Sequence, residues 1–227
     1  GHSLMYRAFF ALPDMDRDGV PTNAVHGFLL MLFKVIEDIA PQYCVVTFDE
    51  HGPVFRHEQY AQYKEGRAPM PDDLRPQFDV IREVLAGMGI QVMSLAGYEA
   101  DDIIGTLSLQ CKQKGVLALI LTGDRDDLQL VDDGVEMLFT RRGISEIERF
   151  DPAGVKAAFG VAPEQVTDLK GLMGDSSDNI PGVPGIGEKT ATKLLQEYGS
   201  LDEVLEAAPT IKGKLGERLR EHGDLAR

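Results

Sequence analysis

The chain has 227 residues, of which 43% are hydrophobic and 26% charged. This length and composition suffice for one large or two small globular domains, and they exclude a collagen-like, coiled-coil or low-complexity chain. The net charge of −14, taken alone, argues against a nucleic-acid partner, because binding phosphates calls for a basic surface. The two cysteines offer no disulfide framework, and no apolar run reaches the roughly 20 residues of a membrane span. We therefore expect no membrane partner and a cytoplasmic location.

Up to residue 150, the sequence predicts strands that alternate with helices. Helices are expected at residues 4–12, 23–39, 73–88, 100–114 and 126–130, and strands at 43–48, 90–95, 116–121, 135–139 and 144–150. Ser3 is the expected N-cap of the first helix, and Thr22 or Asn23 that of the second. Residues 13–21 predict a solvated turn. Such alternation indicates an α/β fold with a mostly parallel central sheet flanked by helices.

After Asp151 the pattern becomes entirely helical. Helices are expected at residues 153–159, 163–173, 187–198, 200–207 and 211–222. We therefore predict two domains: an α/β core over residues 1–160 and a helical module over residues 161–227.

Acidic residues gather at four places, most of them just after a predicted strand. They are Asp49, then Glu99, Asp101 and Asp102, then Asp124 and Asp126, and finally Asp175 and Asp178. In an open α/β sheet, the loops beyond the carboxyl ends of the strands converge on one crevice. Three of these clusters are expected to meet there, with the helical module bringing the fourth alongside. Each cluster on its own is better explained as a helix cap or dipole partner.

Together, the four clusters predict a metal centre. Eight carboxylates within several ångströms would repel one another strongly unless divalent cations compensated them. Oxygen ligands without paired histidine or cysteine suit Mg²⁺ or Mn²⁺ better than zinc. Two such ions about 4 Å apart are a common device for in-line phosphodiester hydrolysis.

The segment Ile180-Pro-Gly-Val-Pro-Gly-Ile-Gly-Glu-Lys-Thr-Ala is the most specific string in the chain. It is not a P-loop, because Glu188 separates the last glycine from the Lys-Thr pair. It matches a helix-hairpin-helix turn over residues 180–195, in which glycines let the backbone approach a phosphate closely. Such a turn binds the sugar-phosphate backbone without reading sequence. The DNA-binding candidates are Gly182, Gly185, Gly187, Lys189, Thr190 and Lys193, and Lys212 and Lys214 would extend the contact.

Residues 51–72 interleave cations with aromatic rings. Arg56, His57, Lys64 and Arg67 supply the charge. This mixture suits single-stranded nucleic acid, because bases stack on rings and phosphates pair with cations. A solvated surface loop would look similar.

Six strings, in order along the chain, carry a resemblance to a known family. They are Thr22-Asn-Ala-Val, Phe55-Arg-His-Glu, Tyr63-Lys-Glu-Gly-Arg67, Gly97-Tyr-Glu-Ala-Asp-Asp-Ile-Ile-Gly105, Thr122-Gly-Asp-Arg-Asp126 and Gly174-Asp-Ser-Ser-Asp-Asn-Ile-Pro-Gly182. Through them the chain resembles, essentially end to end, the 5′-nuclease domain that opens bacterial DNA polymerase I, in the flap endonuclease family. The resemblance implies a PIN-like 5′-nuclease fold with a helical arch and a C-terminal helix-hairpin-helix (helix–three-turn–helix) module.

The resemblance also implies an activity and its residues. The family hydrolyses phosphodiester bonds at DNA 5′ ends and 5′ flap junctions, including nicked, branched and RNA-primed DNA, during primer removal and repair. Its two-metal centre, with Mg²⁺ or Mn²⁺, carries over to Asp49, Glu99, Asp101, Asp102, Asp124, Asp126, Asp175 and Asp178. The arch maps to residues 52–72, where Lys64 and Arg67 would stabilise the scissile phosphate and Arg56 stands at the arch base. Tyr6 matches an aromatic residue on which a base stacks, and the glycine turn would grip the duplex and hold K⁺.

The sequence departs from the family's pattern at its start. Relatives open with a buried strand ending in Asp-Gly, whose Asp is a metal ligand, whereas this sequence begins at Gly1. We therefore expect that a first strand is missing before Gly1, and whether a polymerase domain follows in the natural protein stays open. We also expect a monomer located at the bacterial nucleoid.

Two other functions stay open. Without the first Asp, the chain would bind branched or nicked DNA without cutting it. A metal-dependent phosphatase with Asp124 and Asp126 as ligands is the third reading. The helix-hairpin-helix argues against it, because a small-molecule phosphatase has no use for a duplex grip.

Overall fold

The computed structural model describes the backbone of residues 1–227 and every side chain except that of Arg142. The chain forms two compact units. The first comprises Gly1–Phe55, Ala68–Asp127 and Gly134–Arg149, and the second comprises Arg56–Arg67, Leu128–Asp133 and Phe150–Arg227. Two short helices, α3 (Phe55–Gln59) and η1 (Asp126–Leu130), lie where the chain passes from one unit to the other.

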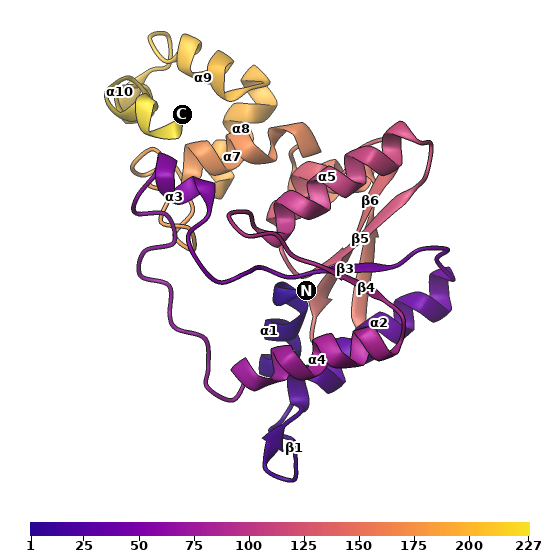
Figure 1. Ribbon diagram of the computed structural model, residues 1–227. Coiled ribbons are helices and arrows are strands. Elements are labelled where there is room, and N and C mark those ends of the chain that lie inside the picture. The colour runs from indigo at the N-terminus through magenta and orange to yellow at the C-terminus, as the bar shows by residue number, and fades with distance from the viewer. The chain divides into compact units, whose positions relative to one another are not determined.

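The first unit holds the strands (Figure 1). Its helices are α1 (His2–Ala11), α2 (Asn23–Ile39), α4 (Arg75–Gly87) and α5 (Ala100–Gln113). Its strands are β1 (Asp16–Arg17), β2 (Val20–Pro21), β3 (Val45–Thr47), β4 (Gln91–Met93), β5 (Ala118–Thr122), β6 (Val135–Arg142) and β7 (Glu146–Phe150), whose last residue already belongs to the second unit. Every expected helix and strand of this region is present, with its ends shifted by a few residues.

Parallel pairing dominates the strands, as the alternating pattern predicted. Strand β3 pairs with β4 and β5 pairs with β6, both in parallel, with Val46 opposite Val92 and Ile120 opposite Met137. Strand β7 lies beside β6. Over the described residues, the strands form three sheets, which are β1-β2, β3-β4 and β5-β6-β7, and no ladder joins β3 to β5. Helix α5 contacts both β3 and β5 and so bridges their two sheets.

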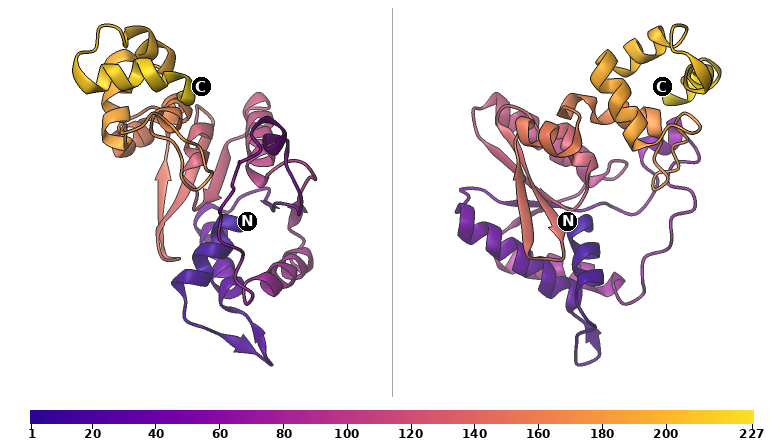
Figure 2. Two further views of the ribbon diagram at one scale, coloured as in Figure 1. Left: turned by 90° about the vertical axis from the view of Figure 1, so that its left-hand side faces the viewer. Right: turned by 180° about the vertical axis from the view of Figure 1, so that it is seen from behind.

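A single apolar core packs helices α1, α2 and α4 against β3. Helix α2 buries Val25, Phe28 and Leu32 along one face, the spacing expected of an amphipathic helix. Phe28 lies beside Phe48, which follows β3 and is fully buried. Helices α1 and α2 lie side by side, and the exposed β1–β2 hairpin projects from them (Figure 2). The solvated turn predicted for residues 13–21 is therefore confirmed.

The N-terminus of α2 is capped from a distant helix. Thr22 occupies the N-cap position, as predicted, but its side chain makes no capping hydrogen bond. Instead Gln77 of α4, fully buried, accepts hydrogen bonds from the backbone N–H groups of Ala24 and Val25 at 2.8 and 3.1 Å. Helix α4 therefore satisfies donors that a local cap would normally satisfy.

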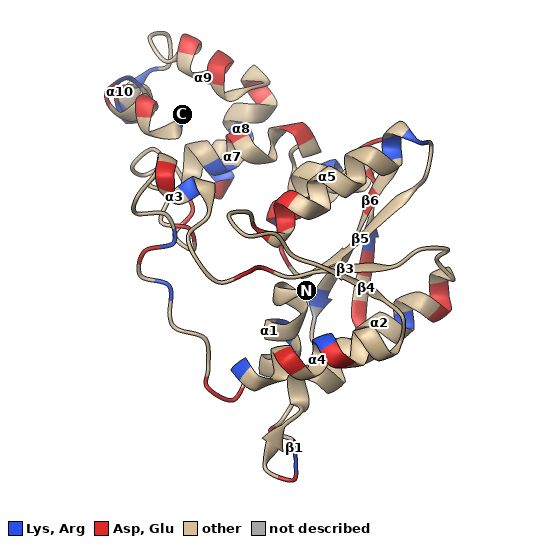
Figure 3. Cartoon of the chain, in the orientation of Figure 1, with Lys and Arg blue, Asp and Glu red and all other residues tan. Residues whose placement is uncertain are grey.

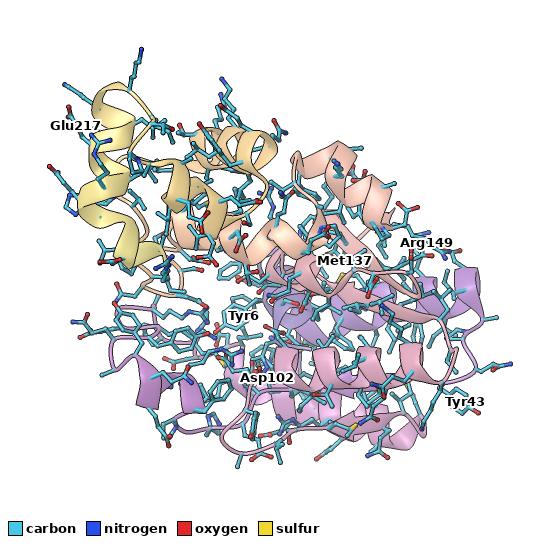
Figure 4. The ribbon with its side chains drawn as sticks, turned by 90° about the horizontal axis from the view of Figure 1, so that it is seen from above. Tyr6, Tyr43, Asp102, Met137, Arg149 and Glu217 are labelled. Atoms are coloured by element: carbon cyan, nitrogen blue, oxygen red, sulfur yellow. The ribbon has the colours of Figure 1, made fainter. Side chains whose placement is uncertain are left out.

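Two details of the sequence prediction are wrong. Helix α1 begins at His2 with Gly1 as its N-cap, so Ser3 does not cap it. The Ser3 hydroxyl instead lies 3.2 Å from that of Thr122, at the end of β5. Strand β3 begins at Val45 rather than at Tyr43, where the predicted strand began. The side chain of Tyr43 is 84% exposed and projects into solvent (Figure 4).

The second unit is helical. It contains α6 (Pro152–Phe159), η2 (Pro163–Gln165), α7 (Val166–Met173), α8 (Glu188–Tyr198), α9 (Leu201–Ala207), α10 (Gly213–His222) and η3 (Gly223–Ala226). Helix α7 packs against α8 and α9 around the buried side chains of Leu172, Leu195 and Val204. Segment 56–67 also belongs to this unit, and residues 52–72 are helical only over Phe55–Gln59. Among the helices described, none is both long and apolar enough to cross a membrane.

Candidate functional site

The acidic residues of the first unit gather around the start of α5. Asp49 lies two residues beyond the end of β3, and its Oδ1 accepts a hydrogen bond from the N–H of Ala100 at 2.6 Å. This bond joins the carboxyl end of β3 to the N-terminus of α5. Figure 3 shows acidic residues where α5 begins, which are Asp101 and Asp102. The predicted meeting of the first two acidic clusters at one sheet edge is therefore observed.

Two of these carboxylates cap the helix. Glu99 is the N-cap residue of α5, and its side chain accepts a hydrogen bond from the third helical N–H group. In return, Asp102 Oδ2 accepts a hydrogen bond from the N–H of Glu99 at 2.9 Å. This reciprocal capping box is enough to explain why Glu99 and Asp102 stand at the start of α5. Their carboxylates also favour the positive end of the helix dipole.

Asp101 does not cap the helix and faces other carboxylates. Burial of its carboxyl group, followed by repulsion from Asp127, Asp124 and Asp49, raises the pKa of Asp101 well above its ordinary value, although part of the residue is exposed. The third acidic cluster, after β5, therefore lies within electrostatic reach of the first two. Asp124 Oδ1 accepts a hydrogen bond from the N–H of Asp126 at 3.0 Å. This turn holds Asp124 and Asp126 together.

Two residues of this region were not predicted from the sequence. Asp127 is 2% exposed, burial raises its pKa to about 6, and its Oδ2 has no hydrogen-bond partner among the described residues. Its only sequence signal is its place after Asp126. His2 accepts a hydrogen bond at Nδ1 from the N–H of Asp49, and burial lowers its pKa to about 4. His2 is therefore neutral at pH 7, and nothing in its sequence context singled it out.

The donor set of this cluster suits a hard divalent cation. Its carboxylates supply only oxygen. Burial and then their mutual repulsion raise the pKa of Asp101, and a bound cation would offset that repulsion. Over the described residues, no three acidic, histidine or cysteine side chains are already gathered closely enough to hold one ion. Asp49, Asp102 and Asp124 instead accept hydrogen bonds from backbone N–H groups. A carboxylate has two oxygens and about four acceptor positions, so these hydrogen bonds do not prevent it from binding an ion.

The fourth acidic cluster belongs to the second unit. Asp175 is 9% exposed and accepts hydrogen bonds from the ammonium of Lys170 and from the hydroxyl and N–H of Ser177. Burial would raise the pKa of Asp175, but these bonds outweigh it and lower the pKa to about 2. Asp175 is therefore ionised at any physiological pH.

Asp178 binds segment 56–67. Its carboxylate accepts a hydrogen bond from the Tyr63 hydroxyl at 3.0 Å and forms an ion pair with the guanidinium of Arg67. Its backbone carbonyl accepts a hydrogen bond from the N–H of Lys64 at 3.0 Å. Lys64 extends over the ring of Tyr63, with its Nζ 4.9 Å from the ring centroid. A predicted metal ligand and two predicted phosphate-binding cations therefore belong to one hydrogen-bonded assembly.

The other two predicted catalytic residues are Arg56 and Tyr6. Arg56 is part of α3, at the start of segment 56–67. Tyr6 lies on α1 in the first unit, half-buried against the apolar core, and its ring centroid is 6.3 Å from that of Phe10.

The glycine-rich segment forms a tight turn before α8. Asp175 and Ile180 exchange two backbone hydrogen bonds of 2.8 Å, which close the loop that precedes the turn. Gly182 has a φ of +58°, and a Cβ there would lie 2.1 Å from the backbone nitrogen of Gly174. Two chain segments therefore approach so closely that only glycine fits. Gly187 is the N-cap residue of α8.

The DNA-binding candidates surround this turn. Gly185, like Gly182, has a positive φ, and Thr190 donates its backbone N–H to the carbonyl of Gly187 within the first turn of α8. Lys189 and Lys193 are exposed on α8, one helical turn apart. Backbone N–H groups and ammonium groups are therefore available at the same end of α8.

Family models cover the whole chain. A model described as "5'-3' exonuclease, N-terminal resolvase-like domain" matches residues 1–160. A model described as "5'-3' exonuclease, C-terminal SAM fold" matches residues 161–227.

Several bacterial proteins are close in sequence. DNA polymerase I of Bacillus caldotenax is 49% identical over 228 residues, which cover 100% of this chain and 26% of that protein. DNA polymerase I of Bacillus subtilis is 48% identical over the same shares. That of Mycobacterium leprae is 46% identical, over 98% of this chain and 25% of that protein. The chain therefore spans about a quarter of the length of these curated relatives.

Solved structures share the fold at low sequence identity. T5 5'-exonuclease with bound zinc has a TM-score of 0.79 at 21% identity, covering 100% of this chain and 84% of that one. A T5 flap endonuclease complex with DNA and metal ions reaches 0.80 at 22% identity, over the same shares. The catalytic core of Rad2 in complex with DNA substrate reaches 0.58 at 18% identity, over 100% and 69%. The α/β core therefore has the resolvase-like fold of 5′-3′ exonucleases, and the helical module has their C-terminal SAM fold.

Proposed function

Because the chain belongs to the 5′-3′ exonuclease family, we propose that it hydrolyses phosphodiester bonds at DNA 5′ ends and 5′ flap junctions. The observation that carries this proposal is the gathering of Asp49, Asp101 and Asp124 at the start of α5, where burial, followed by repulsion from Asp127, Asp124 and Asp49, raises the pKa of Asp101. Carboxylates that repel one another at a sheet edge suit a site for divalent cations. The glycine turn before α8 supplies a grip on a phosphate backbone, which a small-molecule phosphatase would not need.

The proposed roles divide between the two units. The metal ligands are Asp49, Glu99, Asp101, Asp102, Asp124, Asp126, Asp175 and Asp178. When bound there, two Mg²⁺ or Mn²⁺ ions would activate a water molecule and stabilise the leaving oxygen. Lys64 and Arg67 neutralise the scissile phosphate, Arg56 stands at the start of the same segment, and Tyr6 stacks on a base. Asp178 and Arg67 form an ion pair with each other. This pair must separate before Asp178 can bind a metal ion and Arg67 can bind the scissile phosphate.

DNA is held at the glycine turn. The N–H groups around Gly187 and the ammonium groups of Lys189 and Lys193 bind backbone phosphates without reading the sequence. The turn's carbonyls would hold K⁺. The chain acts as a monomer at the nucleoid, where branched, nicked and RNA-primed DNA occurs. Like the matching regions of its relatives, it would act as one part of a longer DNA polymerase I.

One observation favours a second candidate function. No three of the described carboxylates are gathered closely enough to hold one ion, and the second candidate is therefore a chain that binds branched or nicked DNA without cutting it.

Cleavage of a labelled flap substrate separates the candidates. The unaltered chain, Asp124→Ala and the matched control Asp14→Ala, an exposed aspartate outside the cluster, are incubated with 5′-labelled flap DNA and Mg²⁺. Release of short 5′ products by the unaltered chain and the control, but not by Asp124→Ala or with EDTA, supports the nuclease. Bound but uncut DNA supports the second candidate. Hydrolysis of small phosphomonoesters alone would contradict both.

A further inference from the structure

A cation from outside the glycine turn is held against it. Arg218 lies on α10, and its Nη1 donates a hydrogen bond to the carbonyl oxygen of Gly185 at 3.2 Å. Gly185 has a φ of +75°, and a Cβ there would lie 2.3 Å from Arg218 Nη1. Glycine at this position therefore makes room both for the turn and for the guanidinium that rests on it.

Most of the hydrogen-bonding capacity of Arg218 faces solvent. The residue is exposed, and its bond to Gly185 uses one of the five N–H donors of a guanidinium. No carboxylate within the described residues forms an ion pair with it, although Glu217 and Glu221 share its helix. Glu217 lies at the outer edge of α10 (Figure 4). Arg218 is therefore a fixed cation with a free face, next to a turn shaped for a phosphate.

The neighbouring arginine shows what a purely structural role looks like. Arg220 Nη1 donates to the carbonyl of Ala208 at 2.8 Å and approaches that of Ile211 at 3.5 Å, so it ties the last turn of α10 to the segment that precedes the helix. Arg218 makes no second bond of this kind. Its one hydrogen bond, to the carbonyl oxygen of Gly185, orients the guanidinium and leaves its other N–H donors able to bind a phosphate.

We propose that Arg218 is a phosphate-binding residue of the DNA interface, anchored by Gly185 at the glycine turn. This inference rests on the proposed function and adds a contact from α10 to those expected from residues 180–195. The planar guanidinium can bind two phosphate oxygens at once, which the lysines of α8 cannot. Glu188, in the first turn of α8, would oppose an anion there, and Arg218 supplies the charge that offsets it.

Salt dependence of duplex binding tests the proposal. Arg218→Gln, Arg218→Lys and the matched control Arg227→Gln, an exposed arginine paired with Asp202, are compared with the unaltered chain. Anisotropy of a fluorescein-labelled blunt duplex is measured in EDTA from 50 to 400 mM KCl, which excludes cleavage. Losing one phosphate contact makes the slope of log K against log[salt] shallower by about 0.9, and weakens binding about eightfold at 0.1 M salt.

The variants distinguish a phosphate contact from a structural bond. Arg218→Lys keeps the charge and is expected to keep the slope of the unaltered chain, and Arg227→Gln is expected to keep both slope and affinity. Circular dichroism melting verifies that each variant is folded. An Arg218→Gln slope equal to that of the unaltered chain overturns the inference, even if affinity falls. If the unaltered chain binds no duplex, the proposed DNA-binding function itself fails.

Discussion

Replacing Gln77 by methionine removes the cap that α4 provides to α2. Gln77 is fully buried, accepts from the N–H groups of Ala24 and Val25, and donates to the side chain of Asn23 and the carbonyl of Asp73 at 2.9 Å each. Methionine fills a similar volume but leaves both N–H groups buried without partners. Each orphan donor costs about 1–3 kcal/mol, so we expect a loss of about 3 kcal/mol in the free energy of unfolding.

Urea denaturation followed by far-UV circular dichroism measures this loss. For a chain of this size, about 3 kcal/mol corresponds to a melting temperature lower by roughly 6–12 °C. Gln113→Met, at an exposed position of α5, is the matched control and is expected to change the unfolding free energy by less than about 0.5 kcal/mol. A Gln77→Met chain within 1 kcal/mol of the unaltered one, at about the precision of such measurements, would refute the capping role.

Three further outcomes are expected. Gly182→Ala should lower the unfolding free energy by more than Gly213→Ala. Both positions have a positive φ, but of the two only Gly182 has no room for a Cβ, which would lie 2.1 Å from the nitrogen of Gly174. Equal losses would mean that the clash is relieved. Burial raises the pKa of the Cys44 thiol, so its iodoacetamide alkylation rate, followed by peptide mass spectrometry, should still be rising at a pH where that of free cysteine has reached its plateau. A plateau at the same pH as free cysteine would contradict this. Asp101→Asn should raise the melting temperature without metal, by removing a crowded carboxylate, and should abolish the stabilisation by Mg²⁺ expected of the unaltered chain. A lower melting temperature in EDTA would speak against crowding.

The sequence predicted what local patterns control. The apolar spacing of Val25, Phe28 and Leu32 places one face of α2 in the core, and the parallel pairing of β3 with β4 follows from the alternation of strands and helices. The acidic residues after β3 and at the start of α5 meet because parallel strands end at one edge.

Contacts between distant segments could not be predicted in this way. Gln77 caps α2 from more than 50 residues away, and nothing local marks it as a capping residue. The Ser3 prediction failed because a serine near a helix start is a capping candidate by type alone, whereas here its hydroxyl meets Thr122. Asp127 was passed over because an acidic run after a strand does not show which of its members becomes buried.

The path of the chain between the two units has a consequence for how the protein is made. Segment 56–67 belongs with the residues around Asp178, yet it leaves the ribosome about 110 residues earlier. At synthesis rates of about 5–20 residues per second, it waits roughly 5–20 s for its partners. During that interval its two phosphate-binding cations, Lys64 and Arg67, lack their acidic partner and stand beside a growing chain of net negative charge. Non-native ion pairs in this window are the kinetic hazard that such long-range connectivity brings.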